Sequence, residues 1–522
     1  MRSSRLRPGL MFLLCLALFA MPTGVARAAA QAAVQDTSEG TGAVNLMVPP
    51  GVADTAASKP DTGVVLGRAR QPVEVSWSGR FVSLIGMLAM LGIGWLLSAD
   101  RRAVPWRIIA WGIGLQLVFA VFILKTSFGE SVFAAANDVV VALLGFTVQG
   151  ARFLFGDLVF NNVPVGAGEV GNAPMSSTTG MVAQTGAFFA FNVLPTIIFF
   201  SSLMTVLYYL GVMQWIVKKV AWVMMRTMGT SGAETLSSAG NIFLGQTEAP
   251  LLIKPFVKTM TMSELHAVMT GGFATVAGGV MAAYVGMLLH VFPDIAGHLM
   301  AASVMSAPAG LVFAKLIFPE KGEPLTRGKL KVDVEKVDSN IIDAAARGAG
   351  EGLTLALNVG AMLLAFIALI AMLNALLGWF GNVVHLTPML QANGWLDAGD
   401  SLSLEAILGW LLAPLAWLMG VPWKDAPVVG SLLGIKTVLN EFVGYLQLTT
   451  AIPEQGLSQR SIIIATYALC GFANFSSIAI QIGGIGGLAP DRRSDIAKLG
   501  MRAMIAGTLA SFMTATIAGM LA

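Results

Sequence analysis

The sequence predicts an all-α polytopic membrane protein with about eight transmembrane helices plus two opposed re-entrant helical hairpins. Three observations predict this fold. Charged residues make up 12% of the 522 residues, against roughly 25% in a soluble domain. Hydrophobic residues make up 56%, and long apolar segments recur from Phe81 to the C-terminus. Two further apolar stretches are interrupted by prolines and polar residues. The net charge of +3 and two cysteines in apolar runs exclude a basic nucleic-acid binder and a disulfide scaffold.

The first 75 residues combine a leader and a polar tail. Three arginines precede the apolar run 10–20, and small residues follow at 26–28, which is the pattern of a cleavable secretory signal peptide over 1–28. The alternative is an uncleaved first span, but the run is about half of the roughly 20 residues that a bilayer requires. Residues 29–75 lack an apolar period, so we expect a disordered periplasmic tail.

The expected spans are oriented by the lysines and arginines between them, because such residues favour the cytoplasmic side. Arg101, Arg102 and Arg107 lie between the first two apolar segments, so that loop is expected in the cytoplasm. The basic clusters at 320–336 and 492–502 then also face the cytoplasm, and both termini are periplasmic. The eight expected spans are 81–97, 108–124, 188–212, 266–289, 296–318, 353–380, 462–485 and 496–521.

Three other apolar segments are not expected to cross. Charged and amide residues interrupt 127–160, which favours a helix in the outer membrane interface. The stretches 237–260 and 404–447 are broken by prolines and polar at their middles, which favours re-entrant hairpins from opposite faces. A full crossing of either would break the alternation of basic loops downstream. A span with its own interruption follows each hairpin. This order indicates the inverted repeat of a secondary transporter.

Polar residues stand at the middle of both expected hairpins. In the first, Asn241, Gln246 and Glu248 lie in apolar surroundings, where polar groups are costly unless they line a site or meet partners. The alternative is that Gln246 and Glu248 only join the hairpin to its neighbour. In the second, Glu441 could accept hydrogen bonds from vicinal hydroxyls of a sugar. The alternatives there are an ion pair with Lys436 or a proton relay.

Two more polar clusters interrupt the spans that follow the hairpins. The segment 470–477, followed by Gln481, interleaves an amide, hydroxyls and an aromatic ring, a set that can bond to and stack on one small, planar, polar solute. The alternative for its serines is bonding to their own helix. The segment 270–279 is rich in glycine, which indicates helix packing. It also permits an unwound turn whose carbonyls could bind a desolvated Na⁺.

At these four places the sequence resembles the concentrative nucleoside transporter family, in the form of a bacterial member. The strings GQTEAP, TVLNEF and GFANFSSIAIQIGGIGGLAP carry the resemblance, which runs from about Phe81 to the C-terminus. It implies a homotrimer whose protomers each have a scaffold part and a moving transport part with two opposed hairpins. The implied divisions are scaffold spans and an interfacial helix at 76–220, the first hairpin and transport repeat 1 at 221–340, a scaffold span at 341–400, and the second hairpin and transport repeat 2 at 401–522.

The resemblance also implies roles for single residues. Those expected around the nucleobase are Gly245, Gln246, Thr247, Glu248, Val280 and Phe472. Those expected at the ribose hydroxyls are Glu441, Asn474 and Ser477. The Na⁺ ligands would be the side chains of Asn241 and Thr275 and the backbone carbonyls of Leu244 and Val276. These oxygen ligands favour Na⁺ over H⁺ as the coupling ion.

The expected function is therefore cation-coupled import of nucleosides, such as uridine and adenosine, across the lipid bilayer of a bacterial inner membrane by alternating access. A proton-coupled symporter and a passive nucleoside channel are the alternatives. No organic cofactor is expected. An enzyme is disfavoured because the four histidines lack the HExxH spacing of a metalloprotease and three of them lie near span ends.

Overall fold

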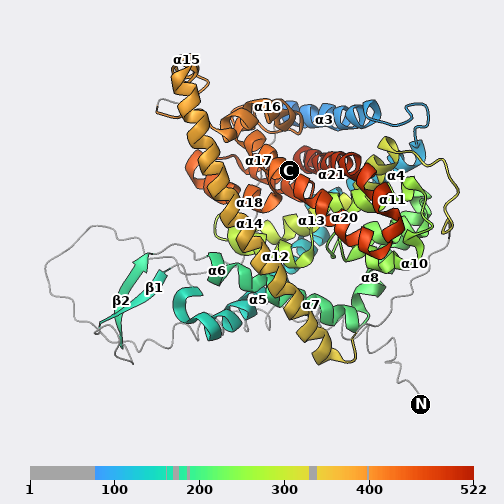
Figure 1. Ribbon diagram of the computed structural model, residues 1–522, viewed down its shortest axis with the longest axis horizontal. Coiled ribbons are helices and arrows are strands. Elements are labelled where there is room, and N and C mark those ends of the chain that lie inside the picture. Colours follow the sequence, from blue (N-terminus) through green and yellow to red (C-terminus); the bar gives the residue numbers. More distant parts are fainter. Residues whose placement is uncertain are drawn as a thin grey trace.

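The computed structural model describes residues 77–159, 162–167, 176–184, 189–328, 338–396 and 399–521. Within these ranges the protein is almost entirely helical, as expected, with one small antiparallel sheet that the sequence did not lead us to expect (Figure 1). The expected signal peptide and the whole of the expected polar tail lie outside the described residues. Both stay predictions.

The N-terminal part of the described chain contains six helices, a 3₁₀ turn and the two strands. These elements are α3 (Trp77–Leu96), α4 (Trp106–Lys125), α5 (Ser127–Phe155), η1 (Gly156–Val159), β1 (Asn162–Ala167), β2 (Ser176–Gln184), α6 (Phe189–Asn192), α7 (Leu194–Tyr209) and α8 (Val212–Met228). Thr126 separates α4 from α5, since its backbone is extended and its side chain accepts a hydrogen bond from Gly129 N at 3.0 Å. Gly211 turns the chain between α7 and α8 at a φ of 81°, which glycine adopts most readily.

Helix α5 covers the segment expected in the membrane interface. It is one continuous helix of 29 residues, long and apolar enough to cross a bilayer. It packs on α13 (Ile295–Ile317), where the Phe133 ring stands 5.0 Å from the His298 ring and where a Cβ added at Gly297 would meet the Phe133 ring. Its length and composition fit both a spanning and an interfacial helix, so the interfacial position stays a prediction.

Two later parts of the described chain share one order of elements: a short hairpin, a broken helix and a long helix. The first copy is α9 (Gly232–Gly240), η2 (Ala249–Ile253), α10 (Lys254–Val257), α11 (Met262–Ala274), α12 (Gly278–Leu288) and α13. The second is α17 (Ala426–Val438), α18 (Glu441–Gln455), α19 (Gln459–Leu469), α20 (Phe475–Leu488), η3 (Pro490–Arg492) and α21 (Arg493–Leu521). Both expected interruptions are present, at 275–277 and at 470–474. The chain therefore contains the predicted internal repeat of element order.

The limits expected for the second hairpin are wrong by one helix. The stretch 404–447 contains α16 (Leu404–Leu418), all of α17 and the start of α18. Pro414 lies inside α16 without ending it. The polar turn instead falls between α17 and α18, where Asn440 has an extended backbone and its side chain caps α18 by accepting from Val443 N at 2.9 Å. The hairpin that carries Glu441 is thus α17–α18, and α16 is a separate helix before it.

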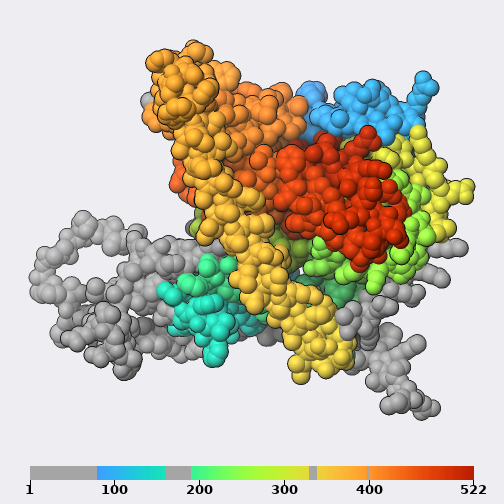
Figure 2. All heavy atoms as spheres, in the orientation of Figure 1, coloured from blue at the N-terminus to red at the C-terminus, as the bar shows by residue number. Residues whose placement is uncertain are grey.

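A long helix crosses the outside of the molecule between the two repeats. This helix, α14 (Ile341–Val383), has 43 residues, so it is about 65 Å long. It begins twelve residues before the expected span 353–380, at a cap where Asn340 accepts from Asp343 N. It runs diagonally over the surface to the short α15 (Leu386–Ala392) (Figures 1 and 2). Only 22% of its most apolar segment is buried, against 89% for α13, which lies in the core with α11 and α21.

Eight helical segments within the described ranges could each cross a membrane by length and composition, which agrees with the expected number. The set differs from the expected one in two members. It includes α5, and it excludes 462–485 because the break after Leu469 leaves two shorter helices there.

The basic loops expected in the cytoplasm lie close to one another. Arg107, at the start of α4, donates to the carbonyl of Thr227 at 3.1 Å. Lys321, after α13, forms an ion pair of 2.8 Å with Asp100 in the loop between α3 and α4. Arg492 donates to backbone carbonyls just after α10. These contacts place the basic loops on one side of the protein.

Candidate functional site

The two helix breaks contact each other in the interior. The backbone N–H of Phe472, in the break between α19 and α20, donates to the carbonyl of Thr275, at the end of α11, over 3.3 Å. The neighbouring Gly471 has a φ of 144°, and a Cβ there would lie 2.7 Å from Ser511 Oγ and 2.8 Å from the carbonyl oxygen of Phe273. Only glycine fits this position. The breaks of both repeats are therefore held together at one place.

The tip of the first hairpin rests on this place. The backbone N–H of Gly278 donates to the carbonyl of Phe243 at 2.9 Å, and the hydroxyl of Ser303 donates to the carbonyl of Ile242 at 2.7 Å. These two bonds join the tip to the start of α12 and to the middle of α13. They use the two carbonyls that precede Leu244, whose own carbonyl is one of the expected Na⁺ ligands.

Gln246, in the tip, bonds to α20 through both ends of its side chain. Its Nε2 donates to Ser477 Oγ at 3.1 Å, and its Oε1 accepts from Gln481 Nε2 at 3.0 Å. Gln246 thus does join the hairpin to its neighbour, which the sequence left open. A primary amide has two N–H groups and two acceptor lone pairs, so one of each remains for a ligand.

The carboxylate of Glu441, at the start of α18, accepts one hydrogen bond on each oxygen. Tyr284 OH donates to Oε1 at 2.9 Å and Asn474 Nδ2 donates to Oε2 at 2.9 Å. Among the residues that the structure describes, Lys436 forms no ion pair with Glu441 and instead donates to the carbonyl of Ala468 at 2.7 Å. Each carboxylate oxygen retains a lone pair for a ligand hydroxyl.

Asn474 joins these two groups of contacts. As the cap of α20, its Oδ1 accepts from Ser477 N at 2.9 Å, which turns its amide nitrogen toward Glu441. A continuous chain of contacts therefore runs through Tyr284, Glu441, Asn474, Ser477, Gln246 and Gln481. It links both hairpin tips through the start of α20.

Four of the nine expected substrate residues lie in this chain: Gln246, Glu441, Asn474 and Ser477. Two other residues of the chain of contacts, Gln481 and Tyr284, had no role predicted from the sequence. The sequence marked Gln481 only as a polar residue that follows the segment 470–477. Tyr284 lies one helical turn after Val280 on the same face of α12, and this spacing is the one signal that could have indicated it.

The remaining expected substrate residues surround the chain without joining it. Val280 is buried in α12, and Phe472 is partly buried at the helix break. Thr247 packs on α20 so closely that a Cβ at Gly484 would lie 2.6 Å from its methyl group. Gly245 donates its N–H to Glu248 Oε2 at 3.2 Å.

Glu248 is the most exposed of the expected site residues. Arg347 and Glu351 of α14 are near enough for their charges to act on its carboxylate. The tip of the first hairpin therefore faces the N-terminal part of the long outer helix.

The side chains of two expected Na⁺ ligands approach the same turn of α11. Asn241 is completely buried, and among the described residues neither its Oδ1 nor its Nδ2 has a hydrogen-bond partner. Its Nδ2 would lie 3.2 Å from a Cβ at Gly271, whose carbonyl accepts from Thr275 Oγ1 at 2.9 Å. A buried amide without partners is costly and requires an explanation. Coordination of a cation by Oδ1 would supply one, so these residues fit the expected ion.

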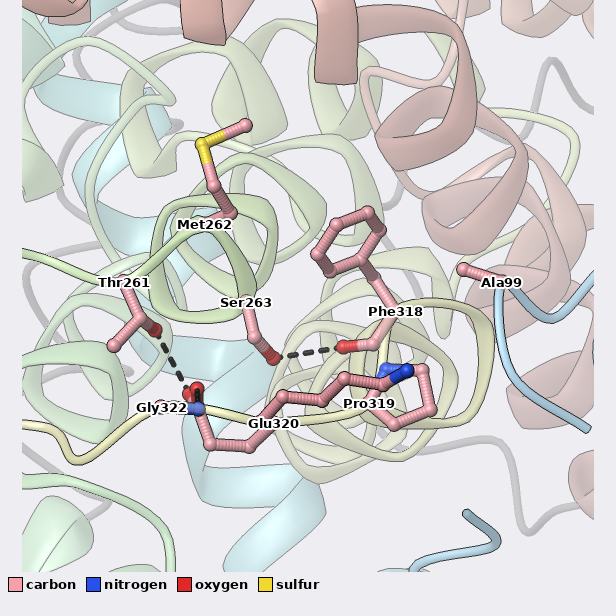
Figure 3. A pocket seen from close by; sticks show the side chains of 9 residues that line it. Ala99, Thr261, Met262, Ser263, Phe318, Pro319, Glu320 and Gly322 are labelled. Atoms are coloured by element: carbon pink, nitrogen blue, oxygen red, sulfur yellow. Dashed lines mark hydrogen bonds between the residues drawn. The ribbon is translucent and has the colours of Figure 1, made fainter. Parts of the chain in front are cut away.

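A separate group of charges lies at the base of the first hairpin, at the opposite end of α11. Lys315 Nζ is 2.7 Å from Glu234 Oε2 and 3.1 Å from Glu320 Oε2. A pocket of about 410 Å³ opens beside it, and Figure 3 shows Thr261 bonded to Glu320 and Ser263 bonded to a backbone carbonyl there. None of the expected site residues lines this pocket.

The pKa of Glu320, which lies after α13, is shifted by these neighbours. Burial alone would raise the pKa, but the charge of Lys315 and the hydrogen bonds from Gly322 N, Lys315 and Thr261 outweigh it and lower the pKa below its ordinary value. Glu320 is therefore ionised in the folded protein at neutral pH.

Three protein-family models match the chain. The model described as Na⁺ dependent nucleoside transporter N-terminus matches residues 85–158, and that described as its C-terminus matches residues 298–519. A model named Gate and described as nucleoside recognition matches residues 190–290. Together these matches cover both repeats and most of the helices before them.

Curated relatives and solved structures agree with these matches. An uncharacterized transporter of Haemophilus influenzae is 44% identical over 442 residues, which is 84% of this chain and 97% of the relative. Sodium/nucleoside cotransporter 1 of Rattus norvegicus is 42% identical over 456 residues, which is 85% of this chain but only 64% of the rat protein.

The fold is similar to that of CNTnw in an inward-facing substrate-bound state, with a TM-score of 0.72, 42% identity, and coverage of 84% of this chain and 98% of that one. A variant of CNTnw in an outward-facing state gives a TM-score of 0.73, 42% identity and coverage of 85% and 98%. The solved relative thus has states that open to opposite sides of the membrane.

Proposed function

The chain belongs to the concentrative nucleoside transporter family, and from this premise we propose that it is a Na⁺-coupled symporter that imports nucleosides across the inner membrane. The family is one of Na⁺-dependent transporters whose solved member adopts alternating-access states. The observation that carries the proposal is the chain of contacts that joins both hairpin tips, through Gln246 and Glu441, to the start of α20.

In this proposal Glu441, Asn474 and Ser477 bind the ribose. Each oxygen of Glu441 already accepts one fixed donor, so its remaining lone pairs have defined directions. Two vicinal hydroxyls of one sugar could donate to the two oxygens together. Hydrogen bonds to a charged acceptor are about twice as strong as those between neutral groups.

The nucleobase would then lie beside the first hairpin tip. Gln246, Thr247 and Glu248 supply its hydrogen bonds, Gly245 leaves space for it, and Val280 and Phe472 contact its faces and edges. A Cβ at Gly245 would be no closer than 3.5 Å to any described side chain, so the protein itself does not require glycine there. This supports a role for Gly245 in admitting the base.

Sodium would be held by Asn241 and Thr275 and by the carbonyls of Leu244 and Val276. An ion at this place ties the first hairpin tip to the break after α11. The same tip carries Gln246, so bound Na⁺ would organise the base contacts and raise nucleoside affinity. Linkage requires that bound nucleoside raise Na⁺ affinity by the same factor. The proton-coupled and channel alternatives lack this reciprocal dependence on Na⁺.

The moving part would comprise residues 221–340 and 401–522, and the scaffold residues 76–220 and 341–400. Each hairpin is bonded at its base to the helix that follows it: Ser231 Oγ donates to Glu264 at 2.6 Å, and Ser458 Oγ donates to Asp425 at 2.8 Å. Such bonds favour movement of hairpin and broken helix as one body.

We further propose that the protein forms a homotrimer and that both of its termini are periplasmic. The exposed apolar surface of α14 and the gathered basic loops support this proposal.

Uptake into proteoliposomes tests the proposal. Labelled uridine and adenosine are offered with an inward Na⁺ gradient at constant pH, and separately with a pH gradient without Na⁺. Accumulation above the external concentration only with Na⁺ is the expected result. Accumulation only with the pH gradient would identify a proton symporter, and equilibration without accumulation would identify a channel.

A further inference from the structure

The contacts of Gln481 determine which way its own side-chain amide points. Gln481 is completely buried in α20, and its Nε2 donates to the backbone carbonyl of Met269 at 3.1 Å. A backbone carbonyl can only accept hydrogen bonds, so the nitrogen of the amide must face it. The opposite orientation would place two acceptor oxygens against each other in the interior, where an unsatisfied polar group is costly.

The same nitrogen then determines the orientation of Gln246. Gln481 Nε2 donates to Gln246 Oε1 at 3.0 Å, so the oxygen of Gln246 is turned toward Gln481. Gln246 Nε2 is consequently turned toward Ser477, at the start of α20 where the proposed substrate groups meet. The carbonyl of Met269 in α11 thus fixes the orientation of the Gln481 amide, and the Gln481 amide in turn fixes the orientation of the Gln246 amide.

Two further observations indicate that the hydrogen bond between Gln481 and Gln246 has a function beyond packing. Gln481 Oε1 is buried and has no hydrogen-bond partner among the described residues, which is a cost that an apolar side chain would not have. A Cβ at Gly272 would lie 2.8 Å from Gln246 Cβ and 2.9 Å from Gln481 Nε2. Only a glycine on that turn of α11 leaves room for the two glutamines to meet.

We propose that Gln481 is a positioning residue for substrate selection: it fixes the amide of Gln246 so that a hydrogen-bond donor, and not an acceptor, faces the nucleobase. This inference rests on the proposed function, since it assumes that Gln246 contacts the base. A base that presents a carbonyl oxygen at its edge away from the ribose gains a hydrogen bond from that donor. A base that lacks this oxygen does not.

The test compares uridine with pyrimidin-2-one riboside, which lacks the 4-carbonyl oxygen, in Na⁺-driven uptake. For the wild-type protein we expect the KM of the analogue to exceed that of uridine by about 2- to 10-fold, the range for one neutral hydrogen bond. In Gln481→Met, of similar volume and without a donor, Gln246 can turn either way and the two KM values should become nearly equal.

Gln481→Glu gives a second, opposite prediction. In either protonation state this carboxyl group can accept a hydrogen bond from Gln246 Nε2. If it is protonated, its one O–H donates to the carbonyl of Met269, so it has no donor left for Gln246. Gln246 would then turn its oxygen toward the base. Uridine should become the poorer substrate of the pair, and cytidine, with an amino group at the same position, should improve relative to uridine.

Gln116→Met is the matched control. Gln116 is also completely buried, its Nε2 also donates to a backbone carbonyl, that of Gly112 at 3.0 Å, and its Oε1 also lacks a partner among the described residues. It lies in α4 and does not contact Gln246. This variant should keep the wild-type ratio of KM values, even if it unfolds at a lower temperature.

The outcomes separate the inference from the proposed function. If the wild-type protein accumulates neither uridine nor cytidine with any cation gradient, the proposed function fails. If it transports both but the ratio of KM values is the same in wild type, Gln481→Met and Gln481→Glu, or if both KM values rise by one common factor, Gln481 has only a structural role and the inference is overturned.

Discussion

The hydroxyl of Tyr284 donates a hydrogen bond of 2.9 Å to Glu441, although the two residues are 157 positions apart in the chain. Tyr284 belongs to the broken helix of the first repeat and Glu441 to the hairpin of the second. The proposed ribose site is therefore assembled from both repeats, and its carboxylate is oriented by a residue that need not contact the sugar.

Removing this hydroxyl should weaken nucleoside binding without stopping transport. In Tyr284→Phe the carboxylate keeps only its bond from Asn474, so its orientation is less fixed. We expect the KM for uridine to rise about fivefold, corresponding to about 1 kcal/mol, with maximal uptake largely kept. Tyr445→Phe is the control, because Tyr445 is equally buried and its ring contacts that of Tyr284, but its hydroxyl donates to the carbonyl of Thr466. Equal KM values in both variants would contradict the role of Tyr284.

Glu441→Gln tests the ribose clamp itself. An amide of the same shape keeps one acceptor oxygen and loses the charge, so recognition of the sugar should weaken by roughly 1.5–3 kcal/mol. Uptake of uridine should be compared with that of its 2′- and 3′-deoxy forms. The substitution should reduce the affinity for deoxyuridine less than the affinity for uridine. The reason is that removing the sugar hydroxyl and replacing the carboxylate both eliminate the same hydrogen bond. Normal uridine affinity in Glu441→Gln would disprove the clamp.

Two threonines, one within α11 and one directly after it, provide a matched test of the Na⁺ site. Thr270 and Thr275 are both completely buried, and each donates its hydroxyl to the carbonyl four residues earlier. Only Thr275 lies at the break beside Asn241. Thr275→Val should therefore raise the Na⁺ concentration for half-maximal uptake at least several-fold, whereas Thr270→Val should leave it near the wild-type value. An equal response of uptake to Na⁺ in the two variants would remove Thr275 from the ion site.

The pH dependence of stability should report the ion pair of Glu320. Its pKa is lowered in the folded protein, so folding favours the ionised form and the stabilisation is complete above the ordinary value of 4.5. It is lost as pH falls through the lower, folded pKa. The unfolding temperature of the detergent-solubilised wild type should thus exceed that of Glu320→Gln at pH 7, and the difference should shrink at acid pH.

Glu323→Gln serves as the control for that measurement, because Glu323 is an exposed carboxylate of the same loop. Its removal should leave the unfolding temperature unchanged over the same pH range. A difference between wild type and Glu320→Gln that stays constant from pH 7 to well below pH 4.5 would exclude the ion pair as its cause.

Local patterns predicted the helical membrane fold and the order of its parts. Apolar runs gave most of the spans, and the polar strings around Gln246 and Glu441 marked both hairpin tips. The limits of the second hairpin were wrong because prolines were taken as breaks. Pro414 is accommodated inside α16, whereas α17 ends before Leu439 and Asn440 caps α18 with no proline beside it. Helix ends depend on which backbone groups find other partners, and composition alone does not show this.

The sequence by itself determined that polar groups must meet inside the membrane, because burying them singly in an apolar chain costs too much. Only the tertiary structure decided which groups meet. Gln246 bonds to Gln481, 235 residues away, because the first hairpin tip packs against α20 where Gly272 of α11 leaves space. Hydropathy is a property of neighbouring residues along the chain, while the direction of an amide or a carboxylate is set by donors and acceptors that packing brings from distant segments.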